Sequence, residues 1–358
     1  MDIGIGFGRV RHWHDGLGEF SRQLGLALAV HAPRLREQHG IGLHFHLPSR
    51  WHGDFGRDVA YLDANTTQRW LHLRPRRFDL WHSFHQFNRL KAPLGTRHRV
   101  ETVHDLNFLH TKQGAKRARY RQALAQRLQG CDAVATISAH AAADLREQLP
   151  TLRAPVSVIH NGVTDLSAAP RRPIDGLDDG TPFLLHVSRM APTKNIAALL
   201  GLAQAWPERR IALAGADSPY TREVEREVAQ RGLANVRIVL DLDEAQKAWA
   251  YAHCEGFLFP SLAEGFGLPP LEAMCFGKPA FLSRRTSLPE VGGEAAWYFD
   301  DAFEPHAMRA LVERGLHEAA DPAVRARIAA HARAFTWERC AASYLALYGR
   351  VLGVEGMA

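Results

Sequence analysis

The chain has 358 residues, of which 46% are apolar and 23% are charged. This balance is typical of soluble globular proteins, and the length suits about two domains, so a disordered chain is excluded. No apolar run reaches the roughly 18 residues of a membrane-spanning helix, and the first residues lack the pattern of a secretory signal. The four cysteines are far apart and form no CxxC pair, which argues against a disulfide scaffold or a zinc cluster. We therefore expect a cytoplasmic protein with reduced thiols.

Positive charge is concentrated in the first half of the chain. Residues 1–165 contain 23 Lys and Arg against 14 Asp and Glu, whereas the remaining residues contain 21 against 24. This asymmetry indicates an acidic partner for the first half, and phosphates, anionic lipid headgroups and nucleic acid all qualify. Nucleic acid ranks last, because no DNA-binding or RNA-binding motif accompanies the pI of 9.3.

Strand-like and helix-like segments alternate along the first half. Short apolar runs predict strands at residues 2–7, 41–47, 79–84, 99–104, 132–138 and 156–160. Apolar residues at helical spacing predict helices at 18–30 and 140–149. Residues 166–180 contain two prolines, two glycines and no periodicity, so we predict an interdomain linker there.

The second half repeats the alternation. Strands are predicted at 183–188, 210–215, 236–240 and 256–260, and helices at 195–206, 270–276 and 335–352. Alternating strands and helices indicate parallel sheets with right-handed crossovers. We therefore predict an α/β protein with two Rossmann-like domains facing a central cleft, in which ligands bind at the carboxyl ends of the strands.

Two short motifs in the first half lie at such strand ends. The segment 15–19, with Gly16 and Gly18, lies between the first strand and its helix, where backbone N–H groups favour an anion. A tight strand-to-helix turn would explain it equally well, and its glycine spacing is not that of the dinucleotide fingerprint. His104 ends the strand 99–104 and is followed by Asp105, which places an imidazole toward the cleft. A structural histidine is the alternative, because the chain contains 20 histidines.

A third motif follows the strand 183–188. Arg189 and Lys194 lie five positions apart in a strand-to-helix loop, a spacing that can bracket one phosphate group. Such cations would stabilise the charge on a departing diphosphate. Two solvated surface cations are the alternative interpretation.

The fourth motif, residues 260–274, carries the most information. Glu264 and Glu272 are separated by seven residues and flank a glycine-rich turn that contains Gly265 and Gly267. A helix that starts at Pro269 directs its positive dipole to the same place. Glu272 would lie one turn into that helix, where its carboxylate can accept both hydroxyls of a ribose. Paired carboxylates also occur in glycosidases, which do not need the two phosphate cradles found in this chain.

The sequence PSLAEGFGLPPLEAM resembles the Glu-x7-Glu signature of the retaining family 4 glycosyltransferases, which have the GT-B fold. The glycine loop, His104 after Thr-Val, the segments TISAHAAADL and VIHNGV, the pair Arg189 and Lys194, and FTW near the end resemble further family segments, in the family's order. The resemblance covers nearly the whole chain. It implies an acceptor-side domain of residues 1–165 completed by a crossing helix at 337–358, and a sugar-nucleotide domain of residues 181–336.

The resemblance also implies roles for individual residues. Arg189 and Lys194 would hold the diphosphate, Glu272 the ribose, Glu264 the sugar hydroxyls, and His104 would contact the sugar. Glu264, His104, Arg189 and Lys194 are thus the expected catalytic residues. The remaining donor-binding residues would be Gly16, Gly18, Leu240, Leu242, Gly265, Phe266, Gly267 and Leu268.

No metal or other cofactor is expected from the resemblance, since a nucleotide-diphosphate sugar is itself the donor substrate. Asp241-Leu242-Asp243 has the spacing of a metal-binding DxD pair, but we interpret it as part of the base pocket. The anomeric configuration would be retained, and the leaving phosphate would help to deprotonate the acceptor.

The acceptor side is less specified. Residues 112–127 carry six Lys and Arg and no acidic residue, among them Lys116, Arg117, Arg119 and Arg121. This segment is either a solvated helix face or a site that docks on an anionic membrane. Trp13, with its neighbours His12 and His14, and residues 81–87 are candidates for lining the acceptor side, and core packing explains them equally well.

We therefore expect a metal-independent hexosyltransferase, cytoplasmic or peripheral on the inner face of the cytoplasmic membrane. It would use a sugar nucleotide, with GDP-mannose favoured, and a glycan or lipid-linked acceptor in the synthesis of bacterial surface polysaccharide, exopolysaccharide or lipopolysaccharide. The alternatives are a UDP-sugar-dependent transferase, a GT-B sugar-nucleotide epimerase and a non-catalytic sugar-nucleotide-binding subunit.

Overall fold

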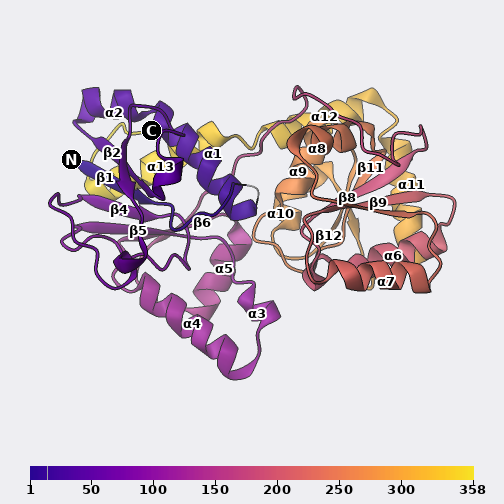
Figure 1. Cartoon of the computed structure of the whole chain (residues 1–358), viewed down its shortest axis with the longest axis horizontal. Coiled ribbons are helices and arrows are strands. Elements are labelled where there is room, and N and C mark those ends of the chain that lie inside the picture. Colours follow the sequence, from indigo (N-terminus) through magenta and orange to yellow (C-terminus); the bar gives the residue numbers. More distant parts are fainter. Residues whose placement is uncertain (14) are drawn as a thin grey trace. The chain divides into compact units, whose positions relative to one another are not determined.

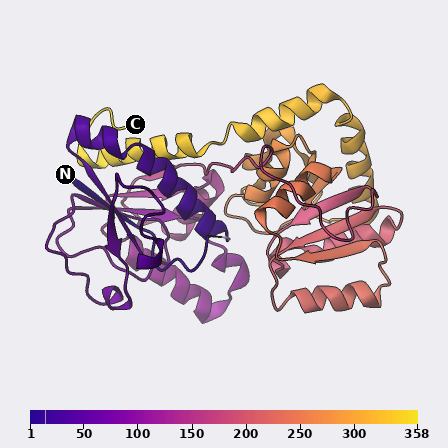
Figure 2. The ribbon, with the colours of Figure 1, turned by 45° about the horizontal axis from the view of Figure 1, so that its top comes forward.

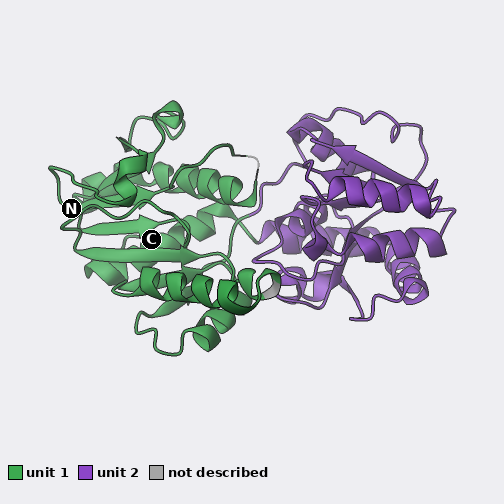
Figure 3. Ribbon diagram, turned by 60° about the horizontal axis from the view of Figure 1, so that its bottom comes forward, with its two compact units in different colours: residues 1–162, 335–358 green, residues 163–334 purple. Residues whose placement is uncertain are grey.

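The computed structural model describes residues 1–13 and 15–358. The chain forms two compact units, residues 1–162 with 335–358, and residues 163–334 (Figure 3). Each unit is built on one parallel β-sheet with helices on its faces. The predicted α/β architecture with two Rossmann-like sheets is therefore confirmed.

The first unit contains a seven-stranded parallel sheet in the order β3-β2-β1-β4-β5-β6-β7. Its strands are β1 (Asp2–Gly6), β2 (Gly42–Leu47), β3 (Ala60–Asp63), β4 (Leu80–Ser83), β5 (His98–Val103), β6 (Ala133–Thr136) and β7 (Val156–Val158). The central strands are buried on both faces, which explains why they are near-continuous apolar runs in the sequence.

Helices and short turns connect these strands. They are α1 (Gly16–Val30), α2 (Ala32–His39), η1 (Ser49–Trp51), η2 (Thr66–Arg69), α3 (Phe108–Thr111), α4 (Gly114–Leu128), α5 (Ala139–Gln148) and α13 (Trp337–Leu352). In Figure 1, α1, α2 and α13 cover one face of the sheet, and α4 and α5 cover the other. This distribution is the one expected of right-handed crossovers.

The C-terminal helix α13 completes the first unit, as the family resemblance implied. It packs along α1, and Figure 2 shows the two helices side by side. The Tyr348 hydroxyl lies 2.6 Å from Nδ1 of His82 on β4, and the Tyr344 hydroxyl lies 2.9 Å from Oγ1 of Thr102 on β5. His82 Nε2 and Thr102 Oγ1 are 2.8 Å apart, so one buried hydrogen-bonded chain joins α13 to two central strands.

The second unit contains a six-stranded parallel sheet in the order β10-β9-β8-β11-β12-β13. Its strands are β8 (Phe183–Val187), β9 (Arg210–Gly215), β10 (Val236–Leu240), β11 (Gly256–Phe259), β12 (Ala280–Ser283) and β13 (Trp297–Phe299). Its helices are η3 (Pro192–Lys194), α6 (Ile196–Ala205), α7 (Thr221–Gln230), α8 (Glu244–His253), α9 (Leu268–Cys275), α10 (Leu288–Gly292), η4 (Gly293–Ala295), α11 (Pro305–Glu318) and α12 (Pro322–Arg333). A core that includes Leu184, Leu199, Leu213 and Leu258 lies between sheet and helices.

Residues 166–180, predicted as a linker, belong to the second unit instead. Leu166, Ile174 and Leu177 are buried in that unit, and the Arg172 N–H donates to the carbonyl oxygen of Ala245. The segment shows no hydrophobic periodicity because it is coil, but its apolar side chains are nevertheless buried in the second unit. The unit boundaries accordingly fall after residues 162 and 334, and not after 165 and 336.

The part of the chain that the structure describes contains no helix long and apolar enough to cross a bilayer.

Candidate active site

The third and fourth motifs meet in the second unit. Strand β8 pairs with β11, so the loops that follow their carboxyl ends lie next to each other. There Lys194 Nζ lies 2.5 Å from Oε1 of Glu264, and both side chains are largely buried. The structure thus brings together a cation and a carboxylate that are 70 residues apart in the sequence.

Hydrogen bonds between backbone and side chains fasten the two loops together. The Thr193 carbonyl accepts from the N–H of Leu262 at 2.8 Å and from Oγ of Ser261 at 3.0 Å. The Ser283 hydroxyl, at the end of β12, donates to the Ser261 carbonyl. Lys194 and Glu264 therefore project from two loops that are hydrogen-bonded to each other.

The glycine-rich turn is fixed from the segment before α10. The Glu264 N–H donates to Oγ1 of Thr286, and the Ser287 hydroxyl donates to the carbonyl of Phe266 at 2.7 Å. Gly267 has φ +120°, a conformation that favours glycine, and it precedes α9, which begins at Leu268. The helix starts one residue earlier than the Pro269 predicted from the sequence.

A buried histidine that sequence reasoning missed supports the Arg189 loop. His186 on β8 donates from Nδ1 to the Leu258 carbonyl at 2.8 Å, and its Nε2 accepts from the Ser188 hydroxyl at 2.7 Å. Burial lowers the pKa of His186 to about 4, so the ring is neutral and can make both bonds. Its signal was present in the sequence as a lone imidazole within the apolar strand FLLHV.

Arg189 itself is exposed, and within residues 1–13 and 15–358 no hydrogen bond or ion pair of its side chain is found. The two cations of the predicted phosphate bracket are therefore not both free, because Lys194 is paired with Glu264. A phosphate that arrives between these loops would meet Arg189 unpaired and would compete with Glu264 for Lys194.

Glu272 lies in the first turns of α9, and its side chain is mostly buried. The Tyr251 hydroxyl donates to its Oε2 at 2.7 Å, and Lys247 Nζ lies 3.2 Å from the same oxygen. Both partners come from α8, and neither was singled out from the sequence. Their hydrogen bonds hold the carboxylate in one orientation, as neighbouring residues commonly do for a ligand-binding side chain.

The predicted base-pocket segment follows β10. Leu240 and Leu242 are half-buried, and Asp241 between them has φ +53°. Asp243 caps the N-terminus of α8 by accepting from the Gln246 N–H, and it also pairs with Arg172. Asp243, one of the two aspartates in the DxD segment, therefore has a structural role. Within the described residues, no group of three or more His, Cys, Asp or Glu side chains is arranged to hold a metal ion.

The glycine loop of the first unit differs from expectation at Gly18. Its N–H, predicted to face a phosphate, donates to Oδ1 of Asp15 at 2.7 Å and thereby caps α1. A Cβ at Gly18 would lie 2.6 Å from the His12 carbonyl oxygen, whereas a Cβ at Gly16 would meet nothing within 4 Å. Close packing therefore accounts for Gly18, and only Gly16 keeps open space for a ligand.

Alanine substitutions should separate these two glycines. We expect Gly18→Ala to destabilise the first unit by about 1–3 kcal/mol, because the new methyl group overlaps backbone atoms. Gly16→Ala should leave the free energy of unfolding unchanged or slightly higher, since its surroundings are open. Urea denaturation of both variants tests this, and equal stabilities would contradict the packing argument.

His104 follows β5 and is buried, which favours the structural histidine that was the alternative to an imidazole in the cleft. Its Nε2 donates to the Phe84 carbonyl at 2.7 Å, and its N–H donates to Oε1 of Gln86. Burial lowers the pKa of His104 to about 4, which leaves Nδ1 as a hydrogen-bond acceptor. His85, also neutral because burial lowers its pKa to about 4, has its ring centre 6.0 Å away.

The aromatic residues predicted for the acceptor side are mostly packing residues. Trp13 is buried against Trp51 and Phe55, and its Nε1 donates to Asp54. Trp81 is buried in the sheet, so both indoles are unsuited to contact an acceptor. His14 lies outside the described residues.

The basic segment 112–127 forms most of α4. Lys116, Arg117, Arg119 and Arg121 are exposed, whereas Leu124 and Leu128 pack on the unit's core. Arg127 turns inward and donates to Oε2 of the buried Glu101 at 2.9 Å. Among residues 1–13 and 15–358, the other five cations of this segment have no ion-pair partner, whereas Arg127 is structural.

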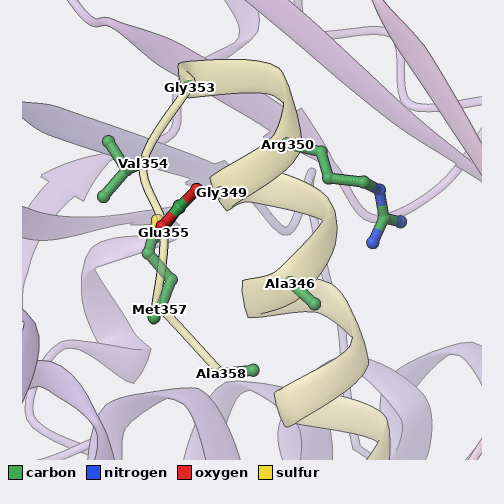
Figure 4. Close-up of a pocket in the computed structure, with 9 residues that line it drawn as sticks. Ala346, Gly349, Arg350, Gly353, Val354, Glu355, Met357 and Ala358 are labelled. Carbon is green, nitrogen blue, oxygen red and sulfur yellow. The ribbon is translucent and has the colours of Figure 1, made fainter.

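A surface hollow of about 460 Å³ lies beside the end of α13, where the last residues fold back along the helix (Figure 4). Its lining consists of Ala346, Gly349, Arg350 and residues 353–358. None of the motif residues lines it, so it is separate from the candidate site.

Comparisons with known proteins agree with this geometry. Two doubly wound sheets define the GT-B class, and the chain has a TM-score of 0.72 to sucrose-phosphate synthase from Thermosynechococcus elongatus, at 19% identity and 99% coverage of both chains. The model of "Glycosyltransferase Family 4" matches residues 10–165, and that of "Glycosyl transferases group 1" matches residues 169–335. The chain belongs to the family 4 glycosyltransferases.

Curated relatives match over shorter stretches. O-antigen chain mannosyltransferase B of Escherichia coli is 34% identical over 176 residues, which are 46% of this chain and 45% of the relative. A GDP-mannose-dependent alpha-(1-6)-phosphatidylinositol dimannoside mannosyltransferase of Mycobacterium tuberculosis is 32% identical over 177 residues, 47% of this chain and 44% of the relative. The matches thus span less than half the length of these relatives.

Proposed function

We propose that the protein is a retaining hexosyltransferase that uses a nucleoside-diphosphate sugar. The observation that carries this proposal is the Lys194–Glu264 pair on the two hydrogen-bonded loops after β8 and β11. The exposed Arg189 lies five residues before Lys194 in the loop after β8. A cation pair suits a diphosphate leaving group, and a carboxylate suits sugar hydroxyls.

Each residue then has a defined task. Arg189 and Lys194 bind the diphosphate and stabilise its charge as it departs, and Glu264, freed from Lys194, accepts hydrogen bonds from the sugar. Gly265, Phe266, Gly267 and Leu268 form the turn and helix start at the phosphates. Glu272, oriented by Tyr251 and Lys247, binds the ribose, and the base lies near Leu240 and Leu242.

The family resemblance assigns two further contacts to the first unit: Gly16 would bind a phosphate, and Nδ1 of His104 would accept from a sugar hydroxyl. During transfer, the bond from the anomeric carbon to the diphosphate oxygen breaks, and a bond to the acceptor oxygen forms on the same face. The acceptor's proton passes to the departing phosphate. Arg189 and Lys194 supply the positive charge, so this mechanism needs neither a metal nor another cofactor.

The relatives favour GDP-mannose as the donor and a glycan or lipid-linked acceptor of surface polysaccharide or lipopolysaccharide. One is named for O-antigen mannosylation, and another for mannose transfer from GDP-mannose to a phosphatidylinositol dimannoside. An acceptor of that kind suits the five cations of residues 112–121, which we propose dock on an anionic membrane surface. A UDP-sugar is the alternative donor.

A nucleotide panel tests the proposal. We expect one of GDP, UDP, ADP and CMP to stabilise the protein, by about 2.7 kcal/mol at a hundredfold excess over its Kd. Arg189→Ala should abolish the shift, whereas Arg222→Ala, an exposed arginine on α7, should retain it. A GDP response supports the mannose donor, and a UDP response replaces it. No response to any nucleotide would overturn the sugar-nucleotide assignment.

A further inference from the structure

Four large apolar side chains of the first unit are exposed close together. Trp70, Leu71, Leu73 and Leu94 expose 63%, 53%, 65% and 61% of their surface, and we call them the apolar ridge. They lie on two strand connections, residues 64–79 between β3 and β4 and residues 84–97 between β4 and β5. Exposed apolar side chains are ordinary when scattered, but a cluster indicates an interaction surface.

The ridge is held in a fixed conformation. The N–H of Leu94 donates to the His72 carbonyl at 2.9 Å, and that of Lys91 donates to the Gln68 carbonyl at 3.1 Å. His72 is itself buried, with Nδ1 2.8 Å from the Lys91 carbonyl and its ring stacked on His46. The two connections are thus fastened to each other and to the core, so the exposure of the leucines is a property of the folded unit.

Positive charge surrounds the ridge. Residues 64–78 and 88–98 contain seven Lys and Arg and no Asp or Glu. Two of these cations, Arg76 and Arg97, pair with Asp2 and Asp79 outside the segments. The Arg69 guanidinium stacks 3.6 Å above the Trp70 ring, which presents a cation and an indole side by side.

The ridge is connected to the basic helix α4. Phe87 and Tyr120 of α4 pack with their ring centres 5.7 Å apart, and Arg127 of α4 reaches the Leu90 carbonyl. The segment that carries Leu94 therefore runs from α4 to the ridge. Arg127 of α4 reaches Oγ of Ser83, and His72 packs on Trp81; because residues 81 and 83 of β4 point to the same face, α4 and the ridge segment lie on the same side of the sheet.

We propose that the apolar ridge inserts into the headgroup region of an anionic lipid bilayer. Trp favours that interface, leucines gain from burial beside the acyl chains, and nearby arginines pair with anionic headgroups. This extends the membrane docking in the proposed function, because α4 alone offers charge but no apolar anchor. Binding should consequently have a part that resists salt, which charge alone cannot provide.

Vesicle sedimentation of the full chain tests the ridge. Leu71→Ser/Leu73→Ser should lower the partition onto vesicles containing phosphatidylglycerol by about tenfold or more, since each lost side chain removes buried apolar surface. Val30→Ser/Val158→Ser is the matched control, because both valines are exposed in the same unit but lie at the end of α1 and on β7, outside the two connections that carry the ridge. Trp70 should also show a blue-shifted emission with these vesicles that disappears in Trp70→Phe.

A charge variant separates this inference from docking by α4. Arg117→Gln/Arg121→Gln should weaken binding at low salt only, and Arg222→Gln/Arg226→Gln on α7 serves as its matched control. If the α4 variant loses binding while the leucine variant keeps it, α4 docks and the ridge proposal is overturned. A second outcome would also overturn the ridge proposal: the wild type binds no vesicle but self-associates, and the leucine variant abolishes the self-association. The ridge would then be a protein contact.

Discussion

Replacing Lys194 by methionine is expected to lower kcat/KM by about 10²–10³-fold, the usual loss when one group that stabilises a developing charge is removed. Methionine keeps the length of the side chain but removes its charge, so the diphosphate would depart with Arg189 alone to stabilise it. The initial rate of nucleoside diphosphate release from the donor identified by the nucleotide panel measures the effect.

The Glu264 partner provides an internal control for this experiment. Lys194→Met leaves a largely buried carboxylate without its cation, so the variant should also lose stability. Adding Glu264→Gln removes that unpaired charge and should restore the free energy of unfolding while activity stays low. If the double variant regained activity together with stability, Lys194 would be a structural residue, and the proposed role would be wrong.

Mild acid is expected to destabilise the first unit more than the second. Burial lowers the pKa of five histidines from 6.5 to about 3 or 4: His46, His82, His85, His104 and His186. Four of them belong to the first unit and only His186 belongs to the second. In the unfolded chain each binds a proton near its ordinary pKa, so the unfolded state gains protons first as the pH falls.

This difference in proton binding makes the free energy of unfolding depend on pH. The stabilising contribution is complete above pH 6.5 and is lost as the pH falls toward 4, by about 2 kcal/mol per histidine at pH 5. Glu101 acts in the opposite direction, because burial raises its pKa to about 7 in spite of the neighbouring Arg127. It offsets part of the loss in the first unit.

Hydrogen exchange at pH 7.5 and at pH 5 would measure this difference. After correction for the intrinsic rate, peptides from β4 and β5 should lose protection at the lower pH, while peptides from β9 and β10 should keep it. His82→Gln should make the pH dependence of the first unit shallower. Equal loss in both units would show that the buried histidines do not control acid stability.

The sequence predicted the architecture because parallel strands buried on both faces remain apolar runs, as in β1, β8 and β11. It missed β3, β12 and β13, and the helices α2, α3, α10, α11 and α12. Strands such as β13 have only three residues, too few to show a period. Helix α2 is mostly polar, and α12 has only Val324 and Ile328 as large apolar side chains, so their apolar stripes are narrow.

Within the candidate site, the motifs identified the loops but not the contacts inside them. That Lys194 pairs with Glu264 depends on the adjacency of β8 and β11, which no local pattern encodes. Tyr251 and Lys247 support Glu272 from α8, whose sequence gives no sign of that role, whereas His186 could have been noticed as a lone imidazole in an apolar strand. Gly18 and Trp13 were candidates for ligand contacts, with a tight turn and core packing as equally good explanations, and in the folded unit the Asp15 cap and the contact with Trp51 favour the structural explanation.

The anchoring of α13 in the first unit has a consequence for how the chain folds during synthesis. Tyr344 and Tyr348 fill the interior of a sheet whose strands are all complete by residue 158. The core of the first unit therefore stays incomplete until the second unit and then α13 have been synthesised. The second unit is continuous in the sequence, so we expect it to reach its native state before the first, although it is translated later.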